Sequence, residues 1–210
     1  MVSDAVTSPS AFVLVVEDIA SVRELMQVQL ELQGYRVITV RDGQEALDFL
    51  AKEKPAAIIT DILMPRVDGF ALAHRLRTNP ATADIPIIFL SATYVAADDE
   101  RFALDLGAMQ FLAKPISTSD LFRALEDALH KTASTDFTMA EREFYMRYRH
   151  RLTTKLNQKD QQIARIQRQL KALSEDQRVT YRQQLVEAEG HRAEIQNELN
   201  SLISVVNALE

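Results

Sequence analysis

The sequence predicts a doubly wound α/β domain with a five-stranded parallel sheet, followed by an all-α region. Five short apolar segments alternate with five segments of helical periodicity over about 120 residues, which is typical of this fold class. The apolar segments are rich in Val and Ile, as expected for strands that helices cover on both faces. Beyond residue 136 the chain has no Pro and a single Gly, and apolar residues recur with a heptad period.

Five segments are predicted as strands from their β-branched, apolar composition and the turn residues that bound them. They are residues 12–16, 35–40, 56–61, 85–90 and 109–113. Five helices alternate with them, each marked by apolar residues at helical spacing. The first helix spans 21–33 and ends before Gly34, and the second begins at Asp42-Gly43. The third runs from Gly69 to just before Asn79-Pro80, the fourth ends at Gly107, and the fifth spans 117–129.

Composition excludes several classes of protein. The chain has no Cys, so it contains no disulfide and no thiolate metal site. The apolar run 12–16 is far too short to span a bilayer, and we expect a cytoplasmic protein without a membrane partner. The net charge of -6 argues against nucleic acid as the main partner. This charge is uneven, with -7 over 1–131, +6 over 137–173 and -4 over 174–210.

Chemically useful side chains follow the predicted strands where each one ends. Glu17 and Asp18 follow the first strand, Asp61 closes the third, and the fourth and fifth deliver the residues Ser91 and Lys114. Because the carboxyl ends of parallel strands share one edge of the sheet, these side chains should meet in a single cleft. Three carboxylates there require a hard cation such as Mg²⁺ as well as the ammonium group. A carboxylate nucleophile, a cation, an ammonium and a hydroxyl are the parts that phosphoryl transfer needs.

As they stand, these residues resemble a known family. The acidic pair Glu17-Asp18, the segment 61–65 with Asp68-Gly69, Ser91-Ala92, and Phe111 three residues before Lys114-Pro115 occur in the order found in the CheY-like receiver domain of bacterial two-component response regulators. The resemblance covers residues 11–130 and implies a flavodoxin-like fold. It also implies a phosphoacceptor signalling protein rather than an enzyme, with aspartyl-phosphate formation and autodephosphorylation as its only chemistry.

The resemblance implies a role for each residue of the cleft. Asp61 would accept a phosphoryl group from a histidine kinase, its phosphodonor. Mg²⁺ would be held by Asp18, Asp61, the backbone carbonyl of Leu63 and, through water, Glu17. Lys114 would pair with the phosphoryl oxygens, and the Lys114-Pro115 bond would be cis.

Two further residues would carry the switch. Ser91 would move toward the phosphoryl group and draw the aromatic residue Phe111 inward, which would reshape the receiver face formed by the fourth helix, fifth strand and fifth helix. Glu17 and Phe111 depart mildly from the family pattern, in which Asp and Tyr are frequent.

Domain boundaries are expected to leave residues 1–10 as a flexible N-terminus, 11–130 as the receiver, 131–136 as a linker and 137–210 as a coiled-coil or helical-hairpin output region. One apolar seam runs through Tyr145, Leu152, Leu156, Ile163, Ile166, Leu170 and Leu173. A second runs through Tyr181, Leu185, Ala188, Ile195, Leu199, Leu202, Val206 and Leu209. The two seams differ in phase by one residue.

The phase shift leaves two architectures open. Ser174 with Gln177 matches a capping box, which would start a new helix at Glu175 and fold the two arms into an antiparallel hairpin. Their opposite charges also favour that pairing. A continuous helix that pairs in parallel with a second copy is the alternative, since the junction has no Gly, Pro or Asn. Either arrangement predicts association, and we expect a homodimer.

We therefore expect a response regulator that signals by altered protein–protein association. The alternatives are a phosphorelay enzyme whose helical half is a histidine-kinase dimerisation or phosphotransfer module, and a constitutive dimeric scaffold. His150 and His191 are the candidates for such a module, although surface histidines are usually only solvated. The sequence ends at Glu210 in mid-heptad, which suggests that the natural chain continues.

Overall fold

The computed structural model describes residues 11–91, 97–130, 139–172 and 175–209 and divides into two compact units, Met1–Thr138 and Met139–Glu210. The sequence-based boundaries at 1–10 and 131–136 lie outside the described residues. Among the helices described, none has the length and apolar character needed to span a bilayer.

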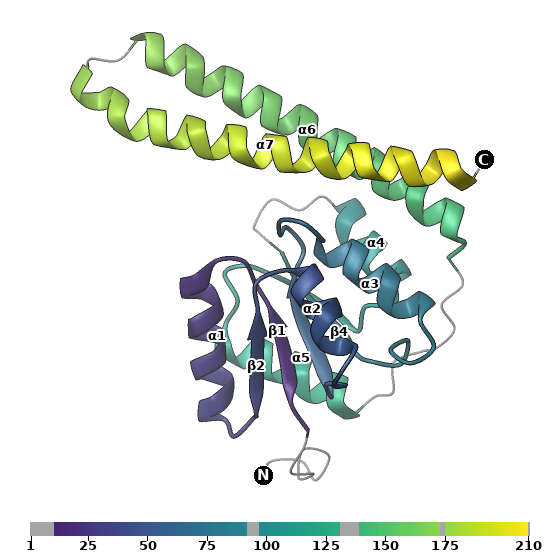
Figure 1. The fold of residues 1–210 in the computed structure, drawn as a ribbon. Coiled ribbons are helices and arrows are strands. Elements are labelled where there is room, and N and C mark those ends of the chain that lie inside the picture. Colours follow the sequence, from purple (N-terminus) through teal and green to yellow (C-terminus); the bar gives the residue numbers. More distant parts are fainter. Residues whose placement is uncertain (1–10, 92–96, 131–138, 173–174, 210) are drawn as a thin grey trace. The chain divides into compact units, whose positions relative to one another are not determined.

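The first unit is built on a parallel sheet with the strand order β2-β1-β3-β4-β5 (Figure 1). Its strands are β1 (Val13–Val16), β2 (Val37–Val40), β3 (Ala57–Asp61), β4 (Ile87–Ser91) and β5 (Gln110–Ala113). The order reverses between β1 and β3, and open α/β sheets bind their ligands at such a reversal. The fold class predicted from the sequence is confirmed.

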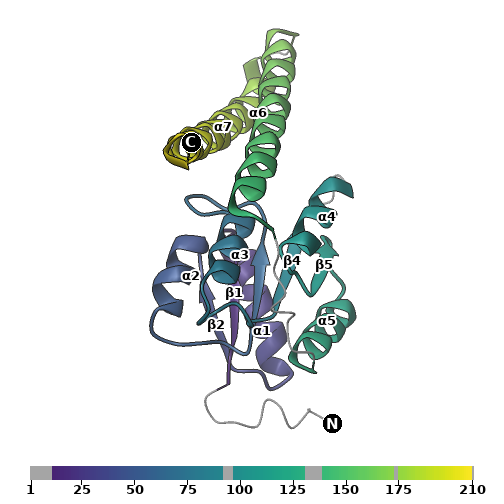
Figure 2. The same ribbon diagram turned by 90° about the vertical axis from the view of Figure 1, so that its right-hand side faces the viewer.

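Five helices cover the sheet: α1 (Ala20–Leu32), α2 (Gly43–Leu50), α3 (Gly69–Thr78), α4 (Ala97–Asp105) and α5 (Thr118–His130). On one face, Met26 and Leu30 of α1 and Leu125 of α5 form a core with alternate residues of β1, β3 and β4. On the opposite face Phe70 of α3 packs against Phe89 of β4, with ring centroids 5.2 Å apart. Figure 1 shows α1 on one side of the sheet and α2 with α3 on the other, and Figure 2 shows the strands side by side.

Local sequence signals explain where the helices begin and end. The Asp42 carboxylate accepts hydrogen bonds from the backbone of Gln44 and Glu45 and caps α2, and Asp68 caps α3 in the same way. Gly34 follows α1 with φ of +88°, a conformation that glycine adopts without strain. The apolar spacing in α1 predicts more core residues than the structure has, because Leu25 and Leu32 are 57% and 79% exposed.

The second unit is an antiparallel hairpin of two long helices, α6 (Glu141–Ala172) and α7 (Glu175–Leu209). Two contacts fix its direction: the Tyr148 hydroxyl near the start of α6 donates to Glu198 at 2.6 Å, and Asp160 in the middle of α6 pairs with the earlier α7 residue Arg192. Of the two architectures that the phase shift left open, the hairpin is therefore the one observed, and the alternative of one continuous helix is wrong. The capping residue proposed for α7, Ser174, lies outside the described residues.

Both predicted seams contribute to the hairpin interface. Leu152 and Ile166 of α6 are buried, as are Ala188, Leu199 and Leu202 of α7. Phe144 and Tyr148 are also buried and stacked, with centroids 5.3 Å apart, although neither belongs to the predicted seam. His150 and His191 are both exposed.

Candidate functional site

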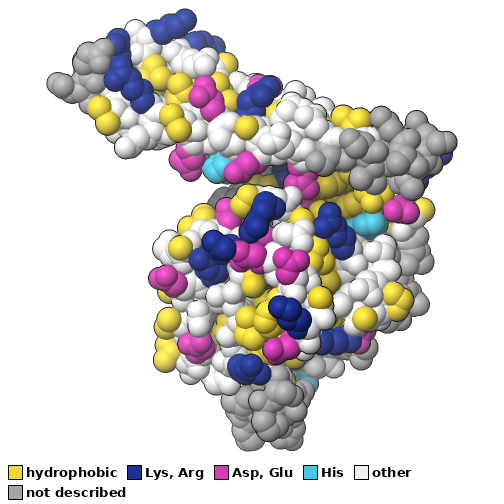
Figure 3. Space-filling view, viewed as in Figure 1, with side chains coloured by type: hydrophobic (Ala, Val, Ile, Leu, Met, Phe, Trp, Pro, Cys, Tyr) yellow, Lys and Arg dark blue, Asp and Glu magenta, His cyan; other side chains and the backbone are white. Residues whose placement is uncertain are grey.

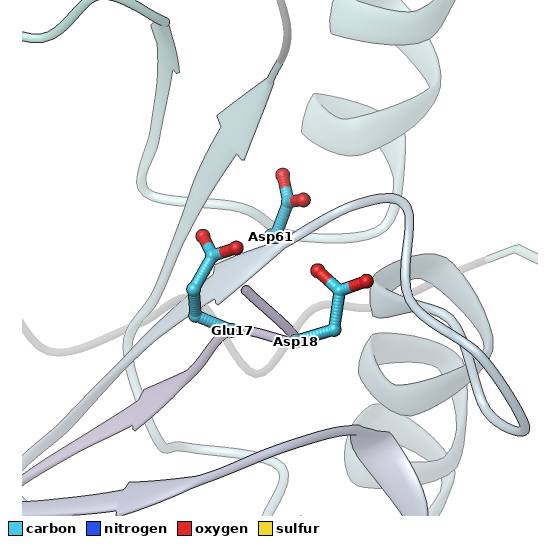
Figure 4. A group of neighbouring side chains, drawn as sticks. All are labelled: Glu17, Asp18 and Asp61. Atoms are coloured by element: carbon cyan, nitrogen blue, oxygen red, sulfur yellow. The ribbon is translucent and has the colours of Figure 1, made fainter. Parts of the chain in front are cut away.

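Three carboxylates meet at the carboxyl ends of β1 and β3. Glu17 and Asp18 directly follow β1, and Asp61 is the last residue of β3. One carboxylate oxygen from each lies within 4.8 Å of the others, and Figure 4 shows the three side chains gathered in one place. The meeting of Glu17, Asp18 and Asp61 that the sequence predicted is thus observed.

Lys114, the first residue after β5, supplies the neutralising charge. Its ammonium nitrogen lies 2.7 Å from Glu17 Oε2 and 3.4 Å from Asp61 Oδ1. Glu17 is completely buried and Asp61 is 7% exposed, so both carboxylates have lost most of their hydration. A buried carboxylate is tolerated only beside an opposite charge, and Lys114 provides that charge to both.

Burial and charge set the protonation behaviour of this cluster. Loss of hydration raises the pKa of Asp61 to about 6, with Lys114 opposing the rise and Glu17 adding to it. Burial lowers the pKa of Lys114, but the neighbouring Asp61 and Glu17 carboxylates outweigh that effect and raise it overall. Lys114 is therefore a cation at neutral pH, while Asp61 is mainly ionised and lies close to its protonation midpoint.

The backbone around the cluster is held by contacts that the sequence analysis missed. Arg23 of α1 donates one Nη1 to the carbonyl oxygens of Glu17 and Asp18, at 2.7 and 3.2 Å. A Cβ on Gly69 would lie 2.3 Å from the carbonyl oxygen of Asp61, so no larger residue fits there. The Arg23 contact could have been predicted from its position, because a residue one turn into α1 lies close to the backbone that leads into the helix.

The candidate switch residues lie on the neighbouring strands. Ser91 ends β4, is buried, and accepts a hydrogen bond through its carbonyl oxygen from the Lys114 amide at 2.6 Å. Phe111 of β5 is half-buried and pairs in register with Phe89. The Lys114-Pro115 peptide bond is cis, as the resemblance implied. Leu63, the proposed carbonyl ligand, lies in the loop after β3 with 48% of its surface exposed.

The donor set fits a hard divalent cation. All three clustered ligands are carboxylates, with no His among the described residues of the cluster, and Mg²⁺ and Ca²⁺ prefer such oxygen donors. The charge of the cluster also fits, because a single ammonium leaves three carboxylates incompletely neutralised.

Comparisons with known proteins point in one direction. A family model described as the response regulator receiver domain matches residues 13–126. The chain is 36% identical over 126 residues to "Probable transcriptional regulator ycf27" of Guillardia theta, a match over 60% of this chain and 48% of that protein. It is 38% identical over 125 residues to "Response regulator MprA" of Mycolicibacterium vanbaalenii, covering 59% of this chain and 52% of the relative.

Solved structures agree with the fold. The chemotaxis response regulator CheY4 of Vibrio cholerae is 31% identical with a TM-score of 0.53, and the match covers 56% of this chain and 98% of that one. The receiver domain of the sensor histidine kinase PA1611 from Pseudomonas aeruginosa, which has a magnesium ion in its active-site cleft, is 29% identical with a TM-score of 0.54. That match covers 58% of this chain and 99% of the other.

The chain spans about half the length of the curated relatives it matches. Several of those relatives are named transcriptional regulators, which argues against the expectation, drawn from net charge, that nucleic acid is not a partner.

Proposed function

The chain belongs to the response regulator receiver domain family of two-component signalling, and from this premise we propose that Asp61 accepts a phosphoryl group from the phosphohistidine of a histidine kinase. The observation that carries the proposal is the position of Asp61, whose carboxylate lies at a strand end within a carboxylate cluster and 3.4 Å from the Lys114 ammonium.

The chemistry of the transfer follows from these positions. An oxygen of ionised Asp61 attacks the phosphorus, a P–O bond forms, the P–N bond to the donor histidine breaks, and the imidazole leaves with the electron pair of that bond. Lys114 is already beside Asp61 and balances the negative charge that arrives with the phosphoryl oxygens. Its second partner, Glu17, lies 2.7 Å from the ammonium nitrogen and helps to hold it in place.

We propose Asp18, Asp61, the Leu63 carbonyl and, through water, Glu17 as the holders of Mg²⁺. When bound, the cation neutralises charge on the phosphoryl oxygens. Ser91 and Phe111 are proposed to carry the switch. Their places on β4 and β5 support this, because both strands border the cleft at its Lys114 side.

The phosphoacceptor role is tested by incubating the full chain with acetyl phosphate and Mg²⁺ and measuring its intact mass. We expect Mg²⁺-dependent addition of one phosphoryl group to the wild type and none to Asp61→Asn. Equal labelling of the two proteins would reject Asp61 as the acceptor, and no labelling of either would reject the receiver chemistry.

For the helical hairpin we propose homodimerisation as the output, through coiled-coil packing with a second copy. Seam residues such as Leu156 and Ile163 stay partly exposed in the single hairpin, and Val179 and Val186 of α7 are 57% and 70% exposed. Apolar side chains that stay exposed to water lower the stability of a two-helix hairpin, which has only a small apolar interface. Packing against a second hairpin would bury them. Light scattering with and without a phosphoryl donor tests whether Asp61 controls this association.

A further inference from the structure

The loop between β3 and α3, residues 62–68, is anchored at two points to the elements around it. The Gly69 amide donates to the Ile62 carbonyl at 3.0 Å and closes the base of the loop. The Gly43 amide, at the start of α2, donates to the Val67 carbonyl at 3.0 Å. This loop contains Leu63, the proposed carbonyl ligand for Mg²⁺, so its position decides where that carbonyl lies.

Arg66 lies in this loop in a backbone conformation that arginine disfavours. Its φ is +66°, in the left-handed region that glycine adopts freely and other residues adopt at a cost of about 1 kcal/mol or more. Among the described non-glycine residues, Arg66 alone has a positive φ. A residue chosen for the backbone turn alone would be glycine or asparagine, so the side chain of Arg66 needs a separate explanation.

That side chain reaches across to α2. Arg66 Nη2 donates to Asp42 Oδ2 and lies 3.3 Å from Glu45 Oε1. The Asp42 side chain is only 2% exposed, and its other oxygen caps α2 by accepting from the amides of Gln44 and Glu45. A charge-assisted hydrogen bond to a buried carboxylate is stronger than an ordinary surface ion pair, because water cannot replace the lost partner of that carboxylate.

We propose that Arg66 is a positioning residue for the metal site, which fixes the loop 62–68 to the N-terminus of α2 and thereby holds the Leu63 carbonyl in place to bind Mg²⁺. The inference rests on the proposed function of the cleft and extends it to a residue that touches neither the metal nor the phosphoryl group. Partners that orient metal ligands from outside the coordination shell typically change metal affinity about 10-fold to 100-fold when removed.

Three variants separate this role from simpler effects. Arg66→Gly removes the guanidinium and also relieves the backbone strain, so the protein is expected to fold. Arg66→Lys keeps the charge without the planar guanidinium. Arg41→Ala is the matched control, since Arg41 pairs with the same Glu45 at 2.9 Å and carries the same charge but lies outside the loop.

The experiment is calorimetric titration of the full chain with Mg²⁺ alone, without a phosphoryl donor. We expect Arg66→Gly to weaken Mg²⁺ binding about tenfold, Arg66→Lys to fall between it and the wild type, and Arg41→Ala to stay within about twofold. Hydrogen exchange gives a second readout: the Gly43 amide, bonded to Val67, should exchange faster in Arg66→Gly and at the wild-type rate in Arg41→Ala.

Three results would overturn the proposal. Wild-type Mg²⁺ affinity in Arg66→Gly would show that the loop needs no support from Arg66, and equal weakening in Arg41→Ala would show a general effect of charge. Acetyl phosphate labelling at saturating Mg²⁺ keeps the proposed function separate. If the wild type binds Mg²⁺ but takes up no phosphoryl group, the phosphoacceptor function fails while the Arg66 result stands. A wild type that binds no Mg²⁺ overturns the positioning role.

Discussion

In the absence of divalent metal, Asp61→Asn should stabilise the receiver unit at neutral and mildly alkaline pH. The pKa of Asp61 is raised from 3.8 to about 6, mainly by burial, so the folded protein binds this proton more tightly than the unfolded chain does. The stability that the protein gains from binding this proton is complete below pH 3.8 and is lost as the pH rises through about 6. A shift of about two pKa units corresponds to about 3 kcal/mol, which is the gain expected for the variant at about pH 8.

Native-state hydrogen exchange of the β1 and β3 amides in the presence of a chelator measures this gain, because these amides report the unfolding of the receiver alone. The difference between variant and wild type should shrink as the pH falls from about 8 to about 4. Asp84→Asn is the control of opposite sign, since the Lys54 ammonium 2.6 Å away holds the pKa of Asp84 below its usual range. A difference for Asp61→Asn that does not change with pH, or a loss of stability at pH 8, would refute the reasoning.

Three further perturbations follow from the site and the hairpin. Lys114→Ala leaves the buried Glu17 carboxylate without its cation and should cost about 3 kcal/mol in urea unfolding, with partial recovery on adding Mg²⁺; no loss would show that the cluster does not need the Lys114 cation. Gly69→Ala places a Cβ 2.3 Å from the Asp61 carbonyl oxygen and should cost about 3 kcal/mol in the same assay, whereas Gly190→Ala, in open space, should not destabilise. Val186→Glu should convert the proposed dimer to a monomer in light scattering, and an unchanged mass would exclude this face of α7 from the interface.

The sheet and its cleft were predictable because their signals are local. Each strand is an apolar run, and the residue that follows it sits at the carboxyl edge whatever the details of packing. Asp61 and Lys114 could therefore be brought together from the sequence although 53 positions separate them. For the helical region the phase change allowed only two arrangements, a hairpin or one helix with a skip residue, and the capping box and the opposite charges of the arms favoured the hairpin without deciding it.

Other features depend on contacts that no local pattern encodes. Leu25 and Leu32 have helical spacing but lie outside the core, because spacing identifies a face of α1 and not its exact width. The burial of Phe144 and Tyr148 follows from side-chain stacking outside the heptad seam. The contact between Arg66 and Asp42 joins residues 24 positions apart and depends on the left-handed backbone conformation of Arg66. No sequence pattern predicts that conformation or identifies Asp42 as the partner.

The phosphoacceptor role of Asp61 is tested most directly by locating the phosphoryl group. The chain is treated with acetyl phosphate and Mg²⁺, the acyl phosphate is reduced with borohydride, and peptides are sequenced by mass spectrometry. We expect the reduced residue to be Asp61, with Glu17 and Asp18 unmodified, and we expect no reduced residue when Mg²⁺ is omitted. Modification at either of the other two carboxylates, or at a histidine of the hairpin, would contradict it.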